Sequence, residues 1–350
     1  MFIKNGWYIG AWADEVTDRP LARRFCNEPV VMYRDLATNT AAALADFCCH
    51  RGAPLSAGRC VEAGIECGYH GMVYAGDGVC VSIPGQGHIP PKARTRSYPL
   101  VEKDGCLWIW MGDPALADTA KIVDYPIHND PVNWPHKHTM YPVAGNAMLM
   151  VDNLMDLTHL GYVHGGTIGG NAKAHVEAIM EVTPKENGLS FTRWMLDHTP
   201  PPTYKRAVPH LADKVDRWAM FEFHAPGVVE HWVGAIEANT GAYDRGKRDG
   251  GFSSRVLHGL TPETETTCHY FWCAANGYGQ HDPKTSEIMF EEIGTAFRQD
   301  QRIVQLQQEK LLEFGEDHLI NTVADGARMH MRRVVERLLA AEAATPNSVR

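Results

Sequence analysis

The chain has 350 residues, of which 44% are hydrophobic and 21% are charged, and this composition is typical of an ordinary globular protein. It holds 33 lysines and arginines against 42 aspartates and glutamates, and a net charge of −9 makes nucleic acid a poor candidate for a partner. No apolar run approaches the roughly 20 residues that a membrane-spanning helix needs, so no membrane partner is expected either.

The N-terminal stretch, MFIKNGWYIGAWADE, mixes aromatic and polar side chains and is interrupted by Gly6 and Gly10. A secretory signal would need a longer apolar region followed by a small-residue cleavage site. The nine cysteines are an odd number. In a chain without such a signal, cysteines are more often metal ligands or buried thiols than a disulfide framework. We therefore expect a cytoplasmic protein.

Residues 1–115 contain short runs of β-branched and aromatic residues, separated by glycine, proline and aspartate. This rhythm predicts a small all-β sandwich or barrel. The clearest predicted strands are Val30–Tyr33, Met72–Tyr74, Val79–Ile83 and Cys106–Trp110.

A polar connector rich in proline and histidine follows over about Asp113–His138, and we place a domain boundary at 115/116. Residues 147–164 are helical in composition, and two further helices are predicted over 286–314 and 327–344. Strand-like runs lie between these helical segments, at Leu189–Trp194, Trp218–Phe223, Val228–Trp232, Arg255–Leu260 and Thr266–Cys273. The second domain, residues 116–350, is therefore predicted to be α+β.

Two short segments, Cys48-Cys49-His50 and Cys67-Gly68-Tyr69-His70, each contribute one cysteine and one histidine. A Cys₂His₂ zinc finger usually takes its cysteines from one segment and its histidines from the other. Here each segment offers one sulfur and one nitrogen, which suits a Rieske [2Fe–2S] centre with both sulfurs on one iron and both imidazoles on the other. We expect Cys48, His50, Cys67 and His70 to be the ligands and Cys49 to be a buried thiol. A structural zinc, or thiols and imidazoles without a metal, are the alternatives.

A second possible metal site lies in the segment NLMDLTHLGYVH, which contains Asn153, Asp156, His159 and His164. Asp156 and His159 are three residues apart and would share a helix face. His159 and His164 are five apart, about 140° around an ideal helix, so they can meet only if the helix ends or distorts between them, for which Gly161 and the Gly165-Gly166 pair offer a place. Two histidines and a carboxylate form the facial triad of non-haem Fe(II) oxygenases. The spacing alone does not decide whether Asp156 or Asp300 supplies that carboxylate.

Both groups of residues, in this order, resemble those of the Rieske non-haem iron oxygenases, in particular the vanillate O-demethylase oxygenase subgroup with toluenesulfonate and dicamba monooxygenases. The resemblance covers nearly the whole chain and rests also on WYIGAW, LVEKDGCLWIWMGDP, LTPETETTCHYFW and the helix around Asp300. It implies a Rieske β domain followed by a helix-grip catalytic domain, an antiparallel sheet with helices, and assembly as a homotrimer.

Carried over residue by residue, the resemblance makes Asp300 the third ligand of the mononuclear iron, beside His159 and His164. Asp156 becomes a bridge between that site and the Rieske histidine of a neighbouring subunit, His70. A carboxylate that is hydrogen-bonded to two imidazoles fixes their tautomers and links the two centres. Asn153 matches a position near the iron, with a helix-packing amide as the alternative.

The resemblance is weakest over residues 195–255, which help to line the substrate pocket in this family. His231 and His258 are candidate polar groups of that pocket, and Arg193, Arg217 and Arg255 could each meet an anionic substrate. Solvent or an acidic partner is the ordinary alternative for such an arginine.

The resemblance implies the terminal oxygenase of a multicomponent system. A flavin- or ferredoxin-type reductase would pass electrons from NADH or NADPH through the cluster to Fe(II), which activates O₂ beside an aromatic substrate. The expected reaction is monooxygenation, most often O-demethylation of a methoxy-aromatic acid such as a methoxybenzoate. The alternatives are ring hydroxylation or dihydroxylation of another aromatic compound, a Rieske electron carrier without oxygenase activity, and a zinc hydrolase.

Overall fold

The computed structural model describes residues 1–344, which form two compact units. Of the described residues, the first unit contains Met1–Asp124, Thr261–Glu265 and Ala341–Ala344, and the second contains Tyr125–Leu260 and Thr266–Ala340. No helix in the described part of the chain is long and apolar enough to cross a bilayer.

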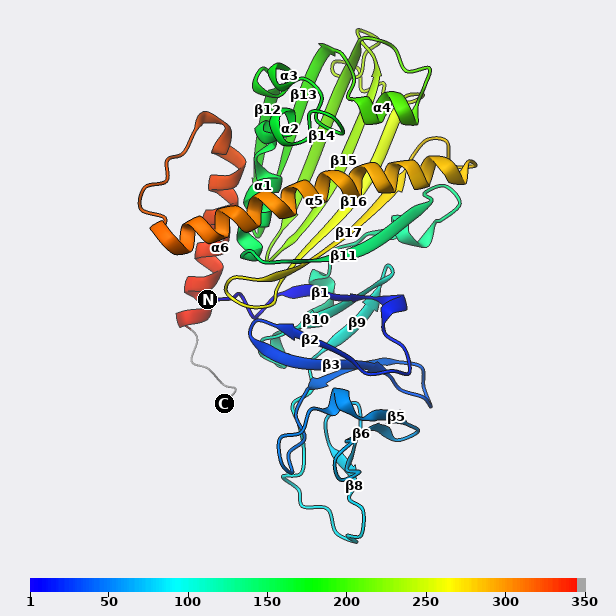
Figure 1. Ribbon diagram of the computed structural model, residues 1–350, viewed down its shortest axis with the longest axis vertical. Helices are drawn as coiled ribbons and strands as arrows, with labels where there is room; N and C mark the ends of the chain where they lie inside the picture. Colours follow the sequence, from blue (N-terminus) through cyan, green and yellow to red (C-terminus); the bar gives the residue numbers. More distant parts are fainter. Residues whose placement is uncertain (345–350) are drawn as a thin grey trace. The chain divides into compact units, whose positions relative to one another are not determined.

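The first unit is built from ten strands in three small sheets, as expected for an all-β domain (Figure 1). The sheet orders are β1-β10-β9, β2-β3-β4 and β5-β6-β7-β8. The strands are β1 Trp7–Trp12, β2 Leu21–Phe25, β3 Glu28–Arg34, β4 Ala41–Ala45, β5 Arg59–Val61, β6 Gly64–Glu66, β7 Val73–Tyr74, β8 Cys80–Ser82, β9 Leu100–Lys103 and β10 Cys106–Trp110.

Two apolar clusters fill this unit, and the second of them lies beneath the cysteine–histidine loops. Leu44, Leu55, Ile65 and Tyr74 are fully buried there, in the same cluster as Cys48 and Cys67. The loops are therefore anchored by their cysteines in an apolar core.

The second unit is a seven-stranded antiparallel sheet in the order β11-β17-β16-β15-β14-β13-β12. One of its strands, β11, begins inside the predicted connector, so this connector is shorter than expected. The strands are β11 His136–Val143, β12 Ile179–Lys185, β13 Gly188–His198, β14 Val215–His224, β15 Val228–Glu237, β16 Phe252–Pro262 and β17 Cys268–Asn276.

A long helix, α5 (Pro283–Phe314), lies across one face of this sheet (Figure 1). It begins where the Asp282 side chain accepts a hydrogen bond from the Lys284 amide, and it ends at Gly315, whose φ of 76° suits glycine. Its buried face follows the 3.6-residue period and contains Met289, Ile293, Phe297, Asp300 and Val304. Asp300 is thus carried into the interior by an otherwise apolar stripe.

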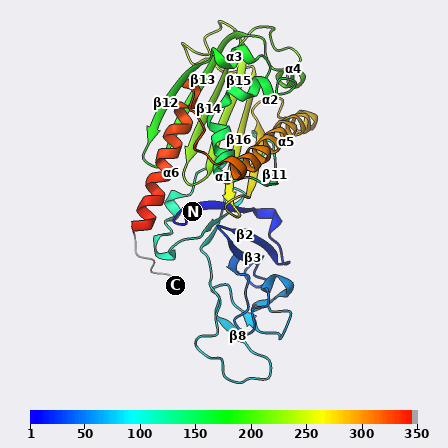
Figure 2. The same cartoon turned by 60° about the vertical axis from the view of Figure 1, so that its left-hand side comes forward.

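The remaining helices complete the second unit. The helix α6 (Gly326–Ala344) runs beside the β12 edge of the sheet (Figure 2), where Arg337 donates to the Asn187 side chain at 3.1 Å. The other helices are α1 Ala147–Met155, α2 Leu160–Val163, α3 Ala172–Val176 and α4 Pro202–Ala207. An antiparallel sheet covered by a long helix is the predicted helix-grip arrangement.

Candidate active site and cluster site

The helical segment 147–164 is broken before His159 and ends at His164. The helix α1 ends at Asp156, whose extended backbone (φ −130°, ψ 107°) starts the short 3₁₀ turn Leu157–His159, and α2 follows. The expected distortion at Gly161 is not seen, because the helix continues through Gly161 and ends only at His164, immediately before Gly165-Gly166. Residue 161 must be glycine for another reason, since a Cβ there would be only 2.2 Å from the Cα of Ala172. The imidazole centroids of His159 and His164 are 5.4 Å apart.

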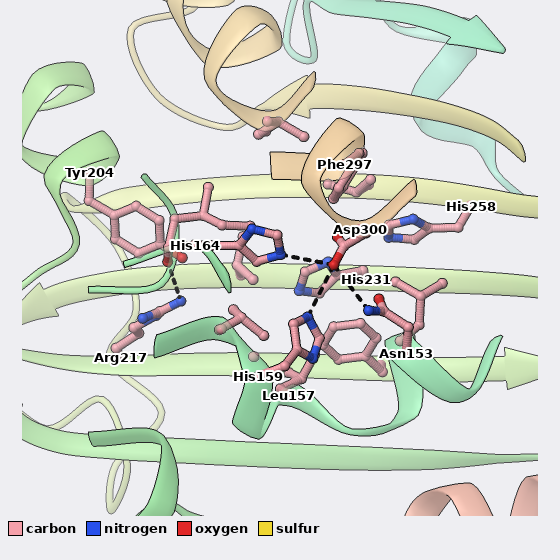
Figure 3. A pocket seen from close by; sticks show the side chains of 18 of the residues that line it. Asn153, Leu157, His159, His164, Tyr204, Arg217, His231, His258, Phe297 and Asp300 are labelled. Atoms are coloured by element: carbon pink, nitrogen blue, oxygen red, sulfur yellow. Dashed lines mark hydrogen bonds and ion pairs between the residues drawn. The ribbon is translucent and has the colours of Figure 1, made fainter. Parts of the chain in front are cut away.

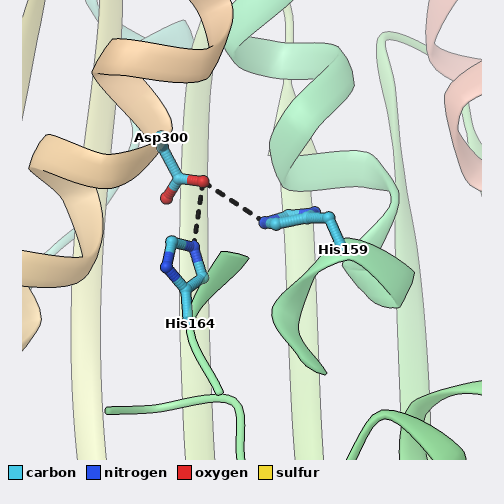
Figure 4. A group of neighbouring side chains, drawn as sticks. All are labelled: His159, His164 and Asp300. Atoms are coloured by element: carbon cyan, nitrogen blue, oxygen red, sulfur yellow. Dashed lines mark hydrogen bonds and ion pairs between the residues drawn. The ribbon is translucent and has the colours of Figure 1, made fainter. Parts of the chain in front are cut away.

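Asp300 of α5 faces both histidines (Figure 4). Its Oδ1 lies 3.3 Å from Nε2 of His159 and 3.0 Å from Nε2 of His164. Burial raises the pKa of Asp300, but contacts with the two imidazoles outweigh burial and bring the pKa to about 2. Asn153 of α1 donates from Nδ2 to the same oxygen at 3.0 Å. The structure therefore brings together Asn153, His159, His164 and Asp300, as the resemblance implied.

The outer nitrogen of each imidazole identifies its tautomer. Nδ1 of His159 lies 2.7 Å from the main-chain oxygen of Asp156, and Nδ1 of His164 lies 2.7 Å from Oε1 of Gln299. Both of these oxygens are acceptors, so each Nδ1 carries a hydrogen, and in the neutral imidazole the Nε2 atom is then free to bind a metal. The two Nε2 atoms and the carboxylate oxygen of Asp300 converge and together offer a donor set for a cation. Two histidines and one carboxylate are the donor set of a mononuclear non-haem Fe(II) site, and the residues fit that metal.

Asp156 differs from the expectation in one respect. Its main-chain oxygen, not its carboxylate, contacts His159, because the helix ends at Asp156 and the two side chains do not share a regular helix face. The carboxylate Oδ1 accepts instead from the amide and the hydroxyl of Thr158, at 2.9 and 2.8 Å. Oδ2 has no hydrogen-bond donor within residues 1–344. The carboxylate thus retains an oxygen that is able to bind a group from outside this chain.

An apolar cavity lies beside the three converging side chains, between the sheet and α5 (Figure 3). Its walls come from the helical segment 153–168, from strands β14 to β16 and from α5, and include Leu157, Ile168, Phe221, Val256 and Phe297. An enclosed apolar cavity with a few polar groups is the ordinary form of a small-molecule site.

His231 and His258 both line this cavity, as expected for candidate pocket groups. Neither ring nitrogen of His231, nor Nε2 of His258, has a hydrogen-bond partner in the described part of the chain, although these atoms are buried. Nδ1 of His258 lies 2.9 Å from the hydroxyl of Tyr270. Burial lowers the pKa of His258 to about 3 and that of His231 well below its ordinary value, so both rings are neutral. Buried polar atoms without partners are expected to bind a ligand or water.

The four expected cluster ligands lie in two facing loops of the first unit. Cys48 and Cys67 are buried, whereas His50 and His70 are exposed with ring centroids 4.4 Å apart. Burial raises the pKa of Cys67, and the main-chain amides of Tyr69 and His70 act in the opposite direction. The residues fit a [2Fe–2S] cluster with mixed ligands. The cysteine sulfurs are buried, the imidazoles are exposed to solvent, and main-chain amides point at the Cys67 sulfur.

Tyr74 is a group at this site that the sequence analysis missed. Its buried hydroxyl lies 3.1 Å from Sγ of Cys48 and 3.2 Å from Sγ of Cys49, and burial raises its pKa well above the ordinary value. Cys49, expected to be buried, is half-buried. The sequence carried no signal for Tyr74 beyond its place in a strand after the second loop.

Two residues that line the cavity, Tyr204 and Arg217, were missed or left open, and so was Gln299, which contacts His164. Gln299 could have been noticed because it precedes Asp300, but a glutamine on a long helix is normally solvated. Arg217, considered as an anion-binding group, is 5% exposed and donates to main-chain oxygens.

Comparisons with known protein families match both parts of the chain. Residues 6–99 match the Rieske [2Fe-2S] domain, and residues 143–341 match the vanillate O-demethylase oxygenase C-terminal domain.

Known proteins resemble the chain over almost its full length. It is 38% identical to a putative toluene-4-sulfonate monooxygenase system iron-sulfur subunit of Comamonas testosteroni, covering 98% of each chain. It is 36% identical to a vanillate O-demethylase oxygenase subunit of a Pseudomonas species, covering 98% of this chain and 96% of that one. The crystal structure of dicamba monooxygenase bound to 3,6-dichlorosalicylic acid superposes with a TM-score of 0.92 at 30% identity, covering 98% and 99% of the two chains.

Proposed function

The chain belongs to the vanillate O-demethylase oxygenase family of Rieske proteins, and from this premise we propose that His159, His164 and Asp300 bind the iron of an aromatic-acid O-demethylase. The protein is an oxygenase subunit of a multicomponent Rieske system, which receives electrons from a separate reductase and acts on an aromatic compound. The observation that carries the proposal is the convergence of the three side chains beside an apolar cavity.

The cluster ligands in this proposal are Cys48 and Cys67 on one iron and His50 and His70 on the other. The buried pair of cysteines and the exposed pair of histidines support this division. Such a division places the imidazole side of the cluster toward the solvent, where it can meet an electron donor or acceptor.

The substrate's acid group is proposed to bind at His231 and His258. Their buried nitrogens without partners can donate to a carboxylate once a ligand enters. Both imidazoles are neutral, so they orient the acid through hydrogen bonds rather than by bringing a full charge into the cavity. Leu157, Ile168, Phe221 and Phe297 would exclude water from the aromatic ring.

The bound iron supplies the activation of O₂, and the chain supplies ligation, orientation and a dry cavity. The aryl methyl ether, O₂, two electrons and two protons give the hydroxymethyl ether and water. The hydroxymethyl ether is a hemiacetal, and its C–O bond to the ring oxygen then breaks to release formaldehyde. The proton of the hemiacetal hydroxyl moves to the aryl oxygen, which gives the phenol.

This reaction predicts that at least one methoxybenzoate or related aryl ether acid releases formaldehyde in proportion to NADH consumed. The reconstituted system, with a surrogate reductase, is assayed on a panel of such acids for substrate-dependent O₂ uptake and for formaldehyde. The demethylated compounds serve as the control for ring hydroxylation. If the panel gives only diols or ring phenols, the enzyme is a ring hydroxylase and the demethylase proposal is wrong.

Gln299 offers a test of the iron site itself. Replacing Gln299 with leucine removes the oxygen that fixes Nδ1–H of His164, so Fe(II) affinity should fall by about 10- to 100-fold, as for other groups that orient metal-binding histidines. The matched control is Gln301→Leu on the same helix, whose amide donates to the Pro142 oxygen instead. Equal Fe(II) dissociation constants for the two variants would contradict the proposed role of His164.

Assembly as a homotrimer completes the proposal. Asp156 lies in a groove whose rim includes Tyr162, Val176 and Val323, which are 75%, 66% and 99% exposed. The cluster loops likewise expose Tyr69 and Phe47 beside the two histidines. We assign the groove to the cluster loops of a second copy, with Oδ2 of Asp156 accepting from His70 of that copy. Reductase, NADH or NADPH and oxygenase would then work together in the cytoplasm.

A further inference from the structure

The six residues after His164, Gly165-Gly166-Thr167-Ile168-Gly169-Gly170, form a loop that leads to α3. Glycine has more conformational freedom to lose on folding than any other residue, so a loop with four glycines needs outside contacts to stay in one conformation. Gly169 must be glycine for a steric reason as well, because a Cβ there would lie 1.9 Å from the main-chain oxygen of Leu160.

This loop is tied directly to His164 and to the cavity. The amides of Thr167 and Gly169 both donate to the main-chain oxygen of His164, at 2.9 and 3.0 Å. The side chain of Ile168 forms part of the cavity wall. A movement of the loop would therefore shift both the His164 backbone and one wall of the substrate site.

Arg217 of β14, whose side chain is among the pocket residues drawn in Figure 3, donates to two main-chain oxygens of this loop. Nη1 donates to the oxygen of Gly169 at 3.1 Å, and Nη2 donates to the oxygen of Ile168 at 3.0 Å. His175, also buried, has Nε2 2.9 Å from the same Gly169 oxygen. The Arg217 guanidinium lies 5.0 Å from the centroid of the Tyr204 ring, and no carboxylate among residues 1–344 forms an ion pair with it.

We propose that Arg217 is a positioning residue, which fixes the 165–170 loop and through it the backbone of His164 and the Ile168 wall of the cavity. The link to iron rests on the proposed function, in which His164 is a ligand. The restraint of the loop by Arg217 does not depend on that function. The two successive oxygens explain why an arginine stands here. Its planar fork places two donors side by side, and a lysine ammonium cannot reach both oxygens in the same geometry.

This role differs from binding the anion of the substrate. Nη1 and Nη2 each donate to a main-chain oxygen of the loop next to His164. Arg217 also lines the cavity, and its buried Nε has no partner within residues 1–344, so a comparison of KM for acids and for their neutral esters is needed to separate the two roles. A positively charged donor strengthens such bonds, which compensates for the absence of side-chain contacts from the four glycines.

The direct test is hydrogen–deuterium exchange of the metal-free full chain, followed by mass spectrometry of peptides covering 160–172. In Arg217→Met the amides of Thr167 and Gly169 should exchange about tenfold faster or more, because charged donors no longer hold the loop. Arg255→Met is the matched control. Arg255 is another arginine of the same sheet, and its guanidinium lies 4.0 Å from the Trp232 ring centroid, away from the loop. It should leave this exchange unchanged.

A second measurement connects the loop to the metal. Fe(II) should bind Arg217→Met about tenfold more weakly than wild type, and the electron paramagnetic resonance signal of its nitric oxide adduct should broaden as His164 becomes less fixed. Arg217→Lys, which keeps the charge and most of the aliphatic stem, should give an intermediate exchange rate. If Arg217→Met does not fold, the exchange rate of Arg217→Lys tests whether Arg217 restrains the loop.

Unchanged loop exchange in the methionine or the lysine variant would overturn the inference. So would unchanged exchange together with a higher KM for acids but not for their neutral methyl esters, since Arg217 would then be an anion-binding group. If loop exchange accelerates as expected but the wild-type protein binds no Fe(II) at His164, the restraint on the loop stands and the proposed function fails.

Discussion

Replacing His159 with alanine is expected to abolish oxygenation while leaving the [2Fe–2S] cluster in place. In the proposed mononuclear site His159 is one of three converging donors, and the remaining two could not hold Fe(II) in a facial arrangement. We expect activity to fall by on the order of 10³-fold or more. The cluster residues belong to the other compact unit and are anchored in its own apolar core, so their environment does not depend on His159.

Iron analysis and electron paramagnetic resonance check this expectation. Anaerobically purified wild-type protein should contain about three irons per chain, two in the cluster and one at the triad. His159→Ala should retain two and keep the signal of the reduced Rieske cluster. The reciprocal variant, Cys67→Ala, should lose that signal and keep the mononuclear iron. A folded His159→Ala protein without a visible Rieske spectrum, or wild-type protein that contains zinc in place of iron, would contradict the assignment of the two sites.

Asp156→Asn is expected to retain both iron sites but to slow electron transfer between them by on the order of 10²-fold. Asparagine keeps the side-chain oxygen that accepts from Thr158, so the turn before His159 should form normally. The main-chain oxygen that contacts His159 is also unaffected. The substitution removes the negative charge and replaces the second carboxylate oxygen, which has no donor within residues 1–344, by an amide nitrogen. Only the proposed bond to His70 of a second copy should therefore be lost.

Single-turnover oxidation of the reduced cluster in the presence of substrate measures this rate. The control is Asp282→Asn, which removes the same charge from another helix-capping aspartate, at the start of α5. It should transfer electrons at the wild-type rate. Wild-type turnover of Asp156→Asn would reduce Asp156 to a capping residue. A stable and active monomer by light scattering would show that no second copy is needed.

The sequence was sufficient to suggest both proposed metal-binding groups because their signals are local. The spacing of Cys48 and His50, and of Cys67 and His70, lies within single loops whose backbone geometry follows from a few residues. The fold class could be predicted for a similar reason, since strand and helix periods repeat over short windows. The all-β first unit and the long helix α5 both appear in the structure as expected.

Asp300 could be predicted only in part from the sequence. Spacing alone did not separate it from Asp156, and a resemblance to a family was needed to prefer it. A local signal was nevertheless present, because Asp300 falls on the buried stripe of Met289, Ile293, Phe297 and Val304. A carboxylate in an apolar stripe is costly without a cation or donors, and this cost marks a functional position.

Only the tertiary structure decided the contacts between residues that are distant in the sequence. His164 meets Gln299 across 135 residues, Asp300 meets Asn153 across 147, and Arg217 meets Gly169 across 48. None of these pairs has a local pattern, because packing of the whole sheet against α5 sets their distance. The same packing placed the Asp156 main chain, rather than its carboxylate, at His159, since the helix ended where an ideal helix would have continued. By itself, the sequence determined the fold class and identified the cysteine and histidine candidates for the two metal sites, because spacing within a loop or helix is local. The tertiary structure decided which atoms of those residues meet, because that depends on how distant elements pack.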